Sequence, residues 1–342
     1  MTETDLNLTA VFAHIAGALP GFDEDLEVTK FATGQSNPTY LLKGSDRAFV
    51  LRRKPPGKLL KSAHAVEREF RVQKALADTD VPVPKMHILC EDSTVIGTPF
   101  YIMEHVPGRN FDDPRLNDLP LLHRQGTMTE MNRVLAALHN VNVEEVGLAD
   151  YGPPGDYFAR QLSRWSSQYA ATKTDVIPAM DQLIDQLGRA LPEDDEQRSL
   201  VHGDYRLDNL IFSEDGSTCR AVLDWELSTL GHPFADLAGV IMQWQMPPGS
   251  EGRGLAGVDR GAQGLMSDEE FVAAYCENRG IAQIENFGFY LAFSFFRMAA
   301  ILQGVRKRAM EGNASNPEKA IKLGRYVPEF ASSGLKALSQ DR

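Results

Sequence analysis

The chain has 342 residues, of which 43% are hydrophobic and 24% charged, values typical of a globular protein large enough for two lobes. Its net charge of −12 argues against a general binder of nucleic acid or of anionic membranes. The 3 cysteines lack metal-site spacing, the start is acidic, and no apolar run approaches the ~20 residues of a bilayer span, so we expect a cytoplasmic protein.

The first hundred residues predict strands and two helices. Helical apolar spacing covers 8–19 and 63–77, and strand patterns cover 26–31, 40–43, 48–53, 85–89 and 100–104. Between the first two strands, small and turn-forming residues that include Ser36 and Asn37 could let N–H and hydroxyl groups approach phosphates. An ordinary hairpin loop is the alternative.

An ion pair is predicted between the third strand and the helix that follows it. The two-residue period places Arg52, rather than Arg53, on the core side. Glu69 lies on the apolar stripe of the helix, where a carboxylate needs a partner, whereas Glu67 faces outward with Arg71 at i+4. Arg52 is the candidate partner of Glu69. The pair could orient phosphates or be purely structural.

The strand over 100–104 is broken by Pro107 and Gly108, and we place the boundary between two lobes there. The predicted domains are residues 1–103, a connection over 104–108, and residues 109–342. An ordinary strand end would give the same pattern.

Helical spacing dominates the second lobe. The predicted helices cover 119–139, 156–169, 179–190, about 236–244 and 290–303. Arg160 and Arg164 lie at i,i+4, which usually indicates a solvated face, although the pair could also meet an anionic substrate group. Residues 246–264 are rich in glycine and lack a period, as in a loop over a substrate entrance or a plain surface loop.

Three side chains with acceptor oxygens flank short apolar runs over 210–223: Asp204, Asn209 and Asp224. The runs predict a hairpin with Asn209 and Asp224 equally far from its tip, and opposed residues have Cβ atoms about 4.5–5.5 Å apart. Such a pair could share one Mg²⁺. Asp204 is then an unpaired carboxylate that could accept a proton from a hydroxyl. Turn capping by Asp204, Asp208 and Asp224 is the alternative.

The spacing of four residues resembles the protein-kinase catalytic loop and the metal-binding Asp that follows it: His202, Asp204, Asn209 and Asp224. Gly203 stands where protein kinases have Arg, and Asp-Trp-Glu replaces Asp-Phe-Gly. These departures are features of the aminoglycoside phosphotransferase and choline kinase superfamily. Within it, the chain looks most like the subgroup related to the kinase-like domain fused to some acyl-CoA dehydrogenases, from about residue 31 to 236 and beyond.

The resemblance implies an α+β, two-lobed protein-kinase-like fold with a small antiparallel-sheet N-lobe, one key helix there, and a larger helical C-lobe. It implies ATP and Mg²⁺ as cofactors. The implied roles are catalytic base for Asp204, Mg²⁺ ligands for Asn209 and Asp224, phosphate orientation for Arg52 with Glu69, adenine contact for the backbone of Glu104 and Val106, and loop support for His202 and Asp236. Arg52 departs from the usual Lys.

The expected function is ATP- and Mg-dependent phosphorylation of a small-molecule hydroxyl. Aminoglycosides are polycations that need an acidic wall, yet 246–264 offers only Glu251 and Asp259 against Arg253 and Arg260, which favours a neutral or anionic alcohol. The resemblance points to a hydroxyacyl-CoA and to a functional link with an acyl-CoA dehydrogenase. An aminoglycoside, choline-type or sugar kinase, a nucleotide-binding pseudokinase and a non-catalytic docking domain remain alternatives. No nucleic-acid or membrane partner is expected.

Overall fold

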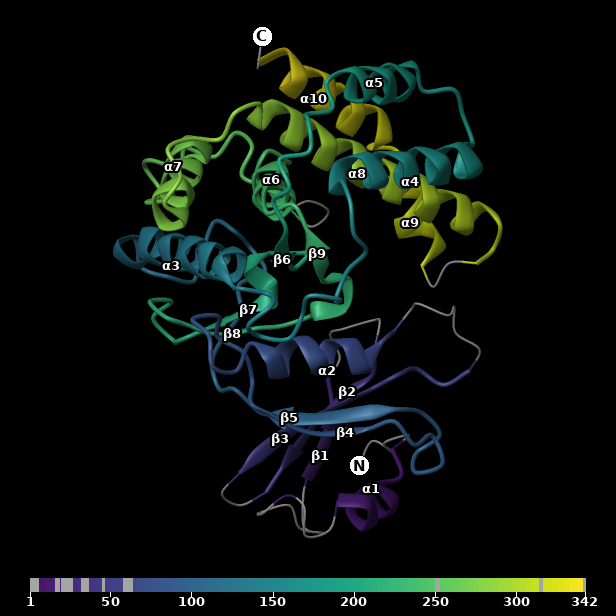
Figure 1. The fold of residues 1–342 in the computed structure, drawn as a ribbon, viewed down its shortest axis with the longest axis vertical. Coiled ribbons are helices and arrows are strands. Elements are labelled where there is room, and N and C mark those ends of the chain that lie inside the picture. The colour runs from purple at the N-terminus through teal and green to yellow at the C-terminus, as the bar shows by residue number, and fades with distance from the viewer. Residues whose placement is uncertain are drawn as a thin grey trace.

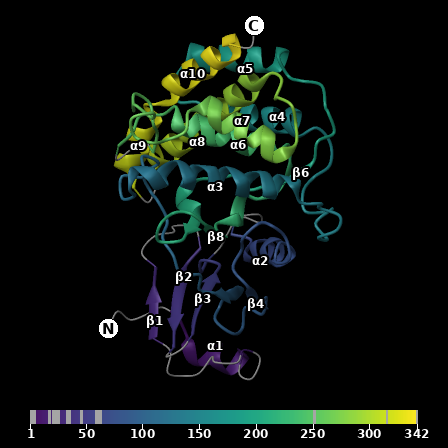
Figure 2. The same cartoon turned by 90° about the vertical axis from the view of Figure 1, so that its left-hand side faces the viewer.

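A computed structural model describes residues 6–15, 19, 27–31, 37–44, 47–57, 64–249, 253–313 and 316–340. These residues form two bodies, a sheet with two helices at one end and a larger helical body at the other (Figure 1, Figure 2). The predicted combination of an antiparallel sheet and a mainly helical remainder is confirmed. The exact boundary over 104–108 stays a prediction.

The smaller body is a five-stranded antiparallel sheet in the order β1-β2-β3-β5-β4. Its strands are β1 (Glu27–Lys30), β2 (Thr39–Lys43), β3 (Ala48–Arg53), β4 (Met86–Cys90) and β5 (Phe100–Glu104), and its helices are α1 (Leu8–Ile15) and α2 (Val66–Ala75). Successive residues of a strand point to opposite faces, so Leu51 packs in the cluster with α1 and Val50 packs in the cluster with α2. All five predicted strands are confirmed.

Both arginines at the end of β3 are shielded from solvent, on opposite faces of the sheet. Arg52 faces α2, as predicted. Arg53 is only 5% exposed and its guanidinium lies 5.7 Å from the ring centre of Tyr40, in the cluster that α1 covers. The prediction that only Arg52 faces a core is therefore wrong, because α1 covers the second face of the sheet.

The larger body consists mainly of helices. They are α3 (Leu121–Asn140), α4 (Tyr157–Thr172), α5 (Pro178–Arg189), α6 (Phe234–Trp244), α7 (Asp268–Arg279), α8 (Phe287–Met310), α9 (Pro317–Gly324) and α10 (Val327–Gln340). Helix α8 packs against α4, α5, α6, α9 and α10, so it forms the centre of this body (Figure 1). The structure adds α7, α9 and α10 to the predicted helices.

Helix α8 is also the one helix of the described residues that is long and apolar enough to cross a membrane by length and composition. Its most apolar window has a mean hydropathy of 1.3, and 72% of that window is buried inside the protein. The expectation that no apolar segment is long enough to span a bilayer is therefore wrong for this helix. Its burial against five neighbouring helices confirms the core position that was predicted for this segment.

Two short antiparallel pairs carry the motif residues between the two bodies. They are β6 (Ser199–Val201) with β9 (Thr229–Gly231), and β7 (Leu210–Phe212) with β8 (Cys219–Val222). The second pair is the predicted hairpin, which lies above α2 in both views (Figure 1, Figure 2).

The register of the hairpin differs from the expected one. The carbonyl of Asn209 accepts the N–H of Leu223 at 2.8 Å, so Asp224 lies one residue beyond the position opposite Asn209. The turn closes between Ser213 and Thr218, nearer to β7 than equal spacing predicts, which by itself would displace the residue opposite Asn209 by two positions. The register shift between Ile211 and Phe212 compensates for one of these two positions. The direct opposition of Asn209 and Asp224 was therefore wrong by one position.

Candidate active site

His202 holds the turn that presents Asp204. Its imidazole is fully buried, and Nε2–H donates to the carbonyl of Leu223 at 2.8 Å. Because a carbonyl can only accept, Nδ1 is left to accept the N–H of Asp204 at 3.3 Å. His202 thus ties the turn of Asp204 to the strand that leads into Asp224.

Asp236, in the first turn of α6, supports the same turn. Its carboxylate accepts the N–H of His202 at 2.6 Å and that of Gly203 at 2.8 Å. Burial raises the pKa of this carboxyl, but the hydrogen bond from His139 and the neighbouring charges outweigh burial and leave the pKa below its ordinary value. Gly203 has φ +82°, and a Cβ there would stand 2.7 Å from the carbonyl oxygen of Leu227, so only glycine fits.

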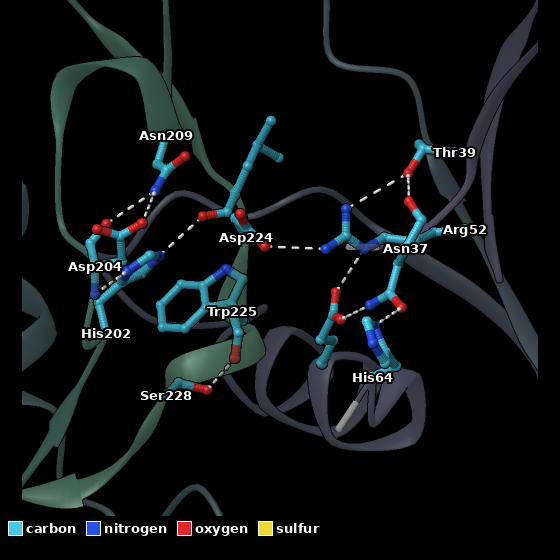
Figure 3. A network of polar contacts seen from close by, with 12 residues as sticks. Asn37, Thr39, Arg52, His64, His202, Asp204, Asn209, Asp224, Trp225 and Ser228 are labelled. Atoms are coloured by element: carbon cyan, nitrogen blue, oxygen red, sulfur yellow. Dashed lines mark hydrogen bonds and ion pairs between the residues drawn. The ribbon is translucent and has the colours of Figure 1, made fainter. Parts of the chain in front are cut away.

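The carboxylate of Asp204 lies at the surface of this turn, 35% exposed. The amide nitrogen of Asn209 donates to the backbone carbonyl of Asp204 at 2.8 Å and lies 3.4 Å from its carboxylate. This bond directs the amide oxygen of Asn209 away from Asp204 (Figure 3). The expectation of an unpaired carboxylate is wrong, because Nε of Arg206 reaches back to 3.3 Å from Oδ1 of Asp204.

Asp224 begins the short 3₁₀ turn Trp225–Leu227 and adopts a left-handed conformation, φ 62° and ψ 58°. Aspartate tolerates this conformation better than most residues do. The indole of Trp225 is buried and donates to the carbonyl of Val222 at 2.9 Å, which anchors the turn. The carboxylate of Asp224, 36% exposed, accepts a hydrogen bond from Nη2 of Arg52 at 2.9 Å.

Arg52 connects Asp224 to helix α2. Its Nε lies 2.9 Å from Oε2 of Glu69, so the predicted Arg52–Glu69 ion pair is present. Burial lowers the pKa of Arg52, but the charge of Glu69 and other neighbouring acids more than reverses this and keeps the pKa above its ordinary value. Glu69 also accepts hydrogen bonds from Nδ2 of Asn37 at 2.8 Å and from the hydroxyl of Tyr101 at 3.1 Å.

The remaining residues expected at a nucleotide are placed as follows. The side chain of Asn37 is buried between Glu69 and His64, and it supports the ion pair (Figure 3). Glu104 ends β5 with its side chain exposed, and Val106 follows in the segment between the two bodies. Ser36 lies outside the described residues.

Glu69→Ala should lower the free energy of unfolding by up to about 3–5 kcal/mol, because the guanidinium of Arg52, with 12% side-chain exposure, loses its buried counter-charge and keeps only the more exposed Asp224. Glu67 on the same helix provides the matched control. Its partner is Lys54, 2.8 Å away, and Glu67→Ala should cost about 0–1 kcal/mol because that pair is more exposed. Urea unfolding measures both values, and equal losses would contradict the inferred importance of the buried pair. The predicted partner of Glu67, Arg71, pairs with Asp150 instead.

Arg164 of α4 and Arg297 of α8 lie near one aromatic ring, 5.3 and 5.9 Å from the ring centre of Trp165. Burial raises the pKa of nearby Tyr157, the charge of Arg297 opposes that rise, and the charge of Asp236 adds to it. Arg297, from α8, donates to the carbonyl of Gly203 at 3.0 Å, next to Asp204. Arg160 donates to backbone carbonyls of the segment before α4, and Arg164 lies over the ring of Trp165.

The arginines of the 246–264 loop are engaged within the protein. The guanidinium of Arg253 pairs with Asp208, and that of Arg260 pairs with Asp268 at 2.6 Å. Glu251 lies outside the described residues. Since both arginines already have acidic partners, the charge balance expected for this loop says little about the acceptor.

The model of the phosphotransferase enzyme family matches residues 27–282. The chain belongs to this family. Its relatives in sequence are longer proteins that are named as acyl-CoA dehydrogenase family members. It is 50% identical over 309 residues to acyl-CoA dehydrogenase family member 10 of Mus musculus, covering 90% of this chain and 29% of the relative. It is 41% identical over 346 residues to acyl-CoA dehydrogenase family member 11 of Rattus norvegicus, covering 98% and 44%. This phosphotransferase chain thus spans less than half the length of these relatives.

Solved structures agree with the family assignment. A protein of Ralstonia eutropha, provisionally named an aminoglycoside phosphotransferase, is 44% identical and has a TM-score of 0.90, with 98% of this chain and 99% of that chain covered. An aminoglycoside phosphotransferase bound to AMP-PNP and hygromycin B has a TM-score of 0.63 at 16% identity, covering 96% and 98%. Choline kinase of Cryptosporidium parvum gives 0.64 at 13% identity, covering 98% and 99%.

These findings confirm the two-lobed kinase-like fold, and membership of the family makes the chain a phosphotransferase that acts on hydroxyl groups. Two side chains near Asp204 were missed by sequence reasoning. Arg206 lies inside the motif, and its spacing of two residues from both Asp204 and Asp208 could have indicated it. Arg297 comes from a distant helix, and no local pattern marks it.

Proposed function

We propose that this phosphotransferase transfers the γ-phosphoryl group of Mg-ATP to the hydroxyl of a small acyl compound, with a hydroxyacyl-CoA as the first candidate. The observation that carries this proposal is the arrangement around the β7–β8 hairpin (Figure 3). The amide of Asn209 contacts the carboxylate of Asp204, and the carboxylate of Asp224 accepts a hydrogen bond from Arg52. Cytoplasmic location is part of the proposal.

The donor atoms of Asn209 and Asp224 fit Mg²⁺, which prefers oxygen ligands and usually keeps phosphate oxygens and waters in its other positions. The amide nitrogen of Asn209 is committed to Asp204, which leaves the oxygen as its donor atom. No group of three His, Cys, Asp or Glu side chains in the described ranges could hold a metal. When bound, Mg²⁺ would neutralise charge on the phosphates.

Each motif residue has a physical role in this proposal. Arg52, held by Glu69, orients the phosphates of ATP from the sheet side. Asp204 orients the acceptor hydroxyl and takes its proton as the oxygen attacks phosphorus. His202 and Asp236 keep the turn of Asp204 in place through buried hydrogen bonds. The backbone of Glu104 and Val106 would meet the adenine. Preorganisation of this kind contributes by positioning and by charge neutralisation.

Local charge supports an anionic acceptor. The guanidinium groups of Arg164 and Arg297 lie 5.3 and 5.9 Å from the ring centre of Trp165, and Arg297 reaches the turn of Asp204. The net charge of −12 would attract a polycation instead, but charge beyond about 8 Å is largely screened at physiological salt. The names of the sequence relatives point to acyl-CoA chemistry and to an acyl-CoA dehydrogenase as a functional partner.

A panel of acceptors with Mg-ATP tests this proposal through ADP release. Hydroxyacyl-CoA esters should be used with a kcat/KM about tenfold or more above that of any aminoglycoside, choline or sugar in the panel. If a kanamycin-type substrate turns over faster than every CoA ester, the acceptor assignment is wrong while the family activity stands. Nucleotide binding without turnover of any alcohol would favour a pseudokinase.

A further inference from the structure

A pocket of about 140 Å³ opens beside Asp204, between its turn, helix α6 and helix α8. Its apolar walls come from three elements, with Leu227 from the 3₁₀ turn, Met242 from α6, and Met298 and Ile301 from α8. Leu227 is one of the large apolar side chains that the described residues leave exposed, at 50%. An apolar ligand would cover it.

The charged groups that line this pocket are few. Asp236 is one, but its carboxylate is committed to the N–H groups of His202 and Gly203. The others are Asp204 and Arg297, and Arg297 already donates one hydrogen bond to the carbonyl of Gly203. One carboxylate beside an apolar wall and a guanidinium is a poor environment for a polycation, because ammonium groups there would lose water without gaining acidic partners.

The volume limits what can fill the pocket. An engineered cavity of about 150 Å³ in a protein core binds benzene, so a pocket of about this size holds roughly six carbon atoms. The pocket is lined by Asp204 on one wall and is partly open to solvent, so a ligand can extend from it. A single unbranched alkyl chain matches both the volume and the walls.

We propose that this pocket is the alkyl subsite of the acceptor. It takes an unbranched chain of about six carbons or fewer that is attached to the carbinol carbon, so that the hydroxyl stands at Asp204. The polar remainder of the acceptor leaves the pocket on the open side. This inference rests on the proposed phosphotransfer. In that step the hydroxyl oxygen forms a bond to the γ-phosphorus, the bond to the β,γ-bridging oxygen breaks, the proton passes to Asp204, and ADP leaves.

Gly239 allows the pocket to be filled without backbone strain. It lies in α6, lines the pocket, and a Cβ built on it meets nothing within 4 Å. Gly239→Leu should therefore occupy space that the alkyl chain needs, and Gly239→Ala should occupy less. Gly188 in α5 is also helical and open, and it lies at the surface away from this pocket, so Gly188→Leu is the matched control.

The experiment uses 4-hydroxyacyl-CoA esters that differ only in the alkyl chain beyond the carbinol carbon, from the shortest member to one of about six carbons there. In the wild type, kcat/KM should rise about tenfold or more along the series. Gly239→Leu should reduce that ratio to near one, Gly239→Ala should reduce it partly, and Gly188→Leu should leave it unchanged. A wild-type ratio near one, or a ratio that Gly239→Leu does not change, would overturn the alkyl subsite.

The same series separates this inference from the proposed function. If no ester is phosphorylated, the acceptor proposal fails, and calorimetric binding of the esters then decides on the pocket. Affinity that rises with chain length and loses that dependence in a folded Gly239→Leu protein supports the subsite. Affinity independent of chain length contradicts it. Thermal unfolding of Gly239→Leu and Gly239→Ala verifies that both variants fold, and the alanine variant serves alone if the leucine variant does not.

Discussion

The Asp204→Asn variant should bind Mg-ATP almost as tightly as the wild type while its turnover falls by about 10²–10⁴, the range for loss of a positioned general base. The substitution keeps the size of the side chain and the backbone bond to His202. It removes the carboxylate that would take the proton from the acceptor. Steady-state ADP release and calorimetry with ATP measure the two quantities.

The effect should be specific to this carboxylate. Asp215, in the turn of the same hairpin, accepts its hydrogen bonds from Ser213 and Ser217 rather than from a motif residue, so Asp215→Asn is the control. It should keep turnover near that of the wild type. Near-normal turnover of Asp204→Asn would remove Asp204 from the mechanism, whatever the control does.

Replacing Asp224 should abolish the part of ATP binding that depends on Mg²⁺. Alanine at this position leaves a single amide oxygen at Asn209, and asparagine leaves two neutral amide oxygens. Without a carboxylate, neither set holds a strongly hydrated ion against water. Asp224→Ala also places alanine at φ 62°, where it is strained, so Asp224→Asn is the better variant because asparagine tolerates this region. In both variants Arg52 loses one acidic partner but keeps Glu69.

Calorimetric titration with ATP, once with Mg²⁺ and once with EDTA, isolates this effect. The wild type should bind ATP more tightly with Mg²⁺, and the two Asp224 variants should show the same affinity in both buffers. An increase with Mg²⁺ that persists in Asp224→Asn would contradict the shared-metal interpretation. Weaker binding of Asp224→Ala alone would indicate strain in the turn.

Local sequence patterns were sufficient for the five strands of the sheet, the hairpin, most helices and the motif, but not for β9. Strand β3 was predicted with its observed bounds, because alternation and the following prolines are local signals. The ion pair of Arg52 with Glu69 followed from one carboxylate on an apolar helical stripe. Helix α7 could also have been found, since Ser267 and Glu270 form a capping box at its start.

Contacts between distant elements were beyond such patterns. The bond from Arg52 to Asp224 spans 172 positions and the bond from Arg297 to Gly203 spans 94, so neither is encoded by local spacing. The hairpin register depended on where the turn closed, which composition does not determine. Arg206 is the exception, because its spacing of two residues from Asp204 and Asp208 is a local signal that was overlooked.

The most direct test of phosphoryl transfer at Asp204 is to identify its product. The wild type is incubated with Mg-ATP and a 4-hydroxyacyl-CoA, and mass spectrometry follows the formation of its phosphate monoester beside ADP. We predict a phosphate monoester in an amount equal to ADP, no product with EDTA, and a rate about 10²–10⁴ lower in Asp204→Asn. ADP that accumulates without any phosphorylated alcohol, or phosphate monoester formed equally well by Asp204→Asn, would contradict the proposed reaction.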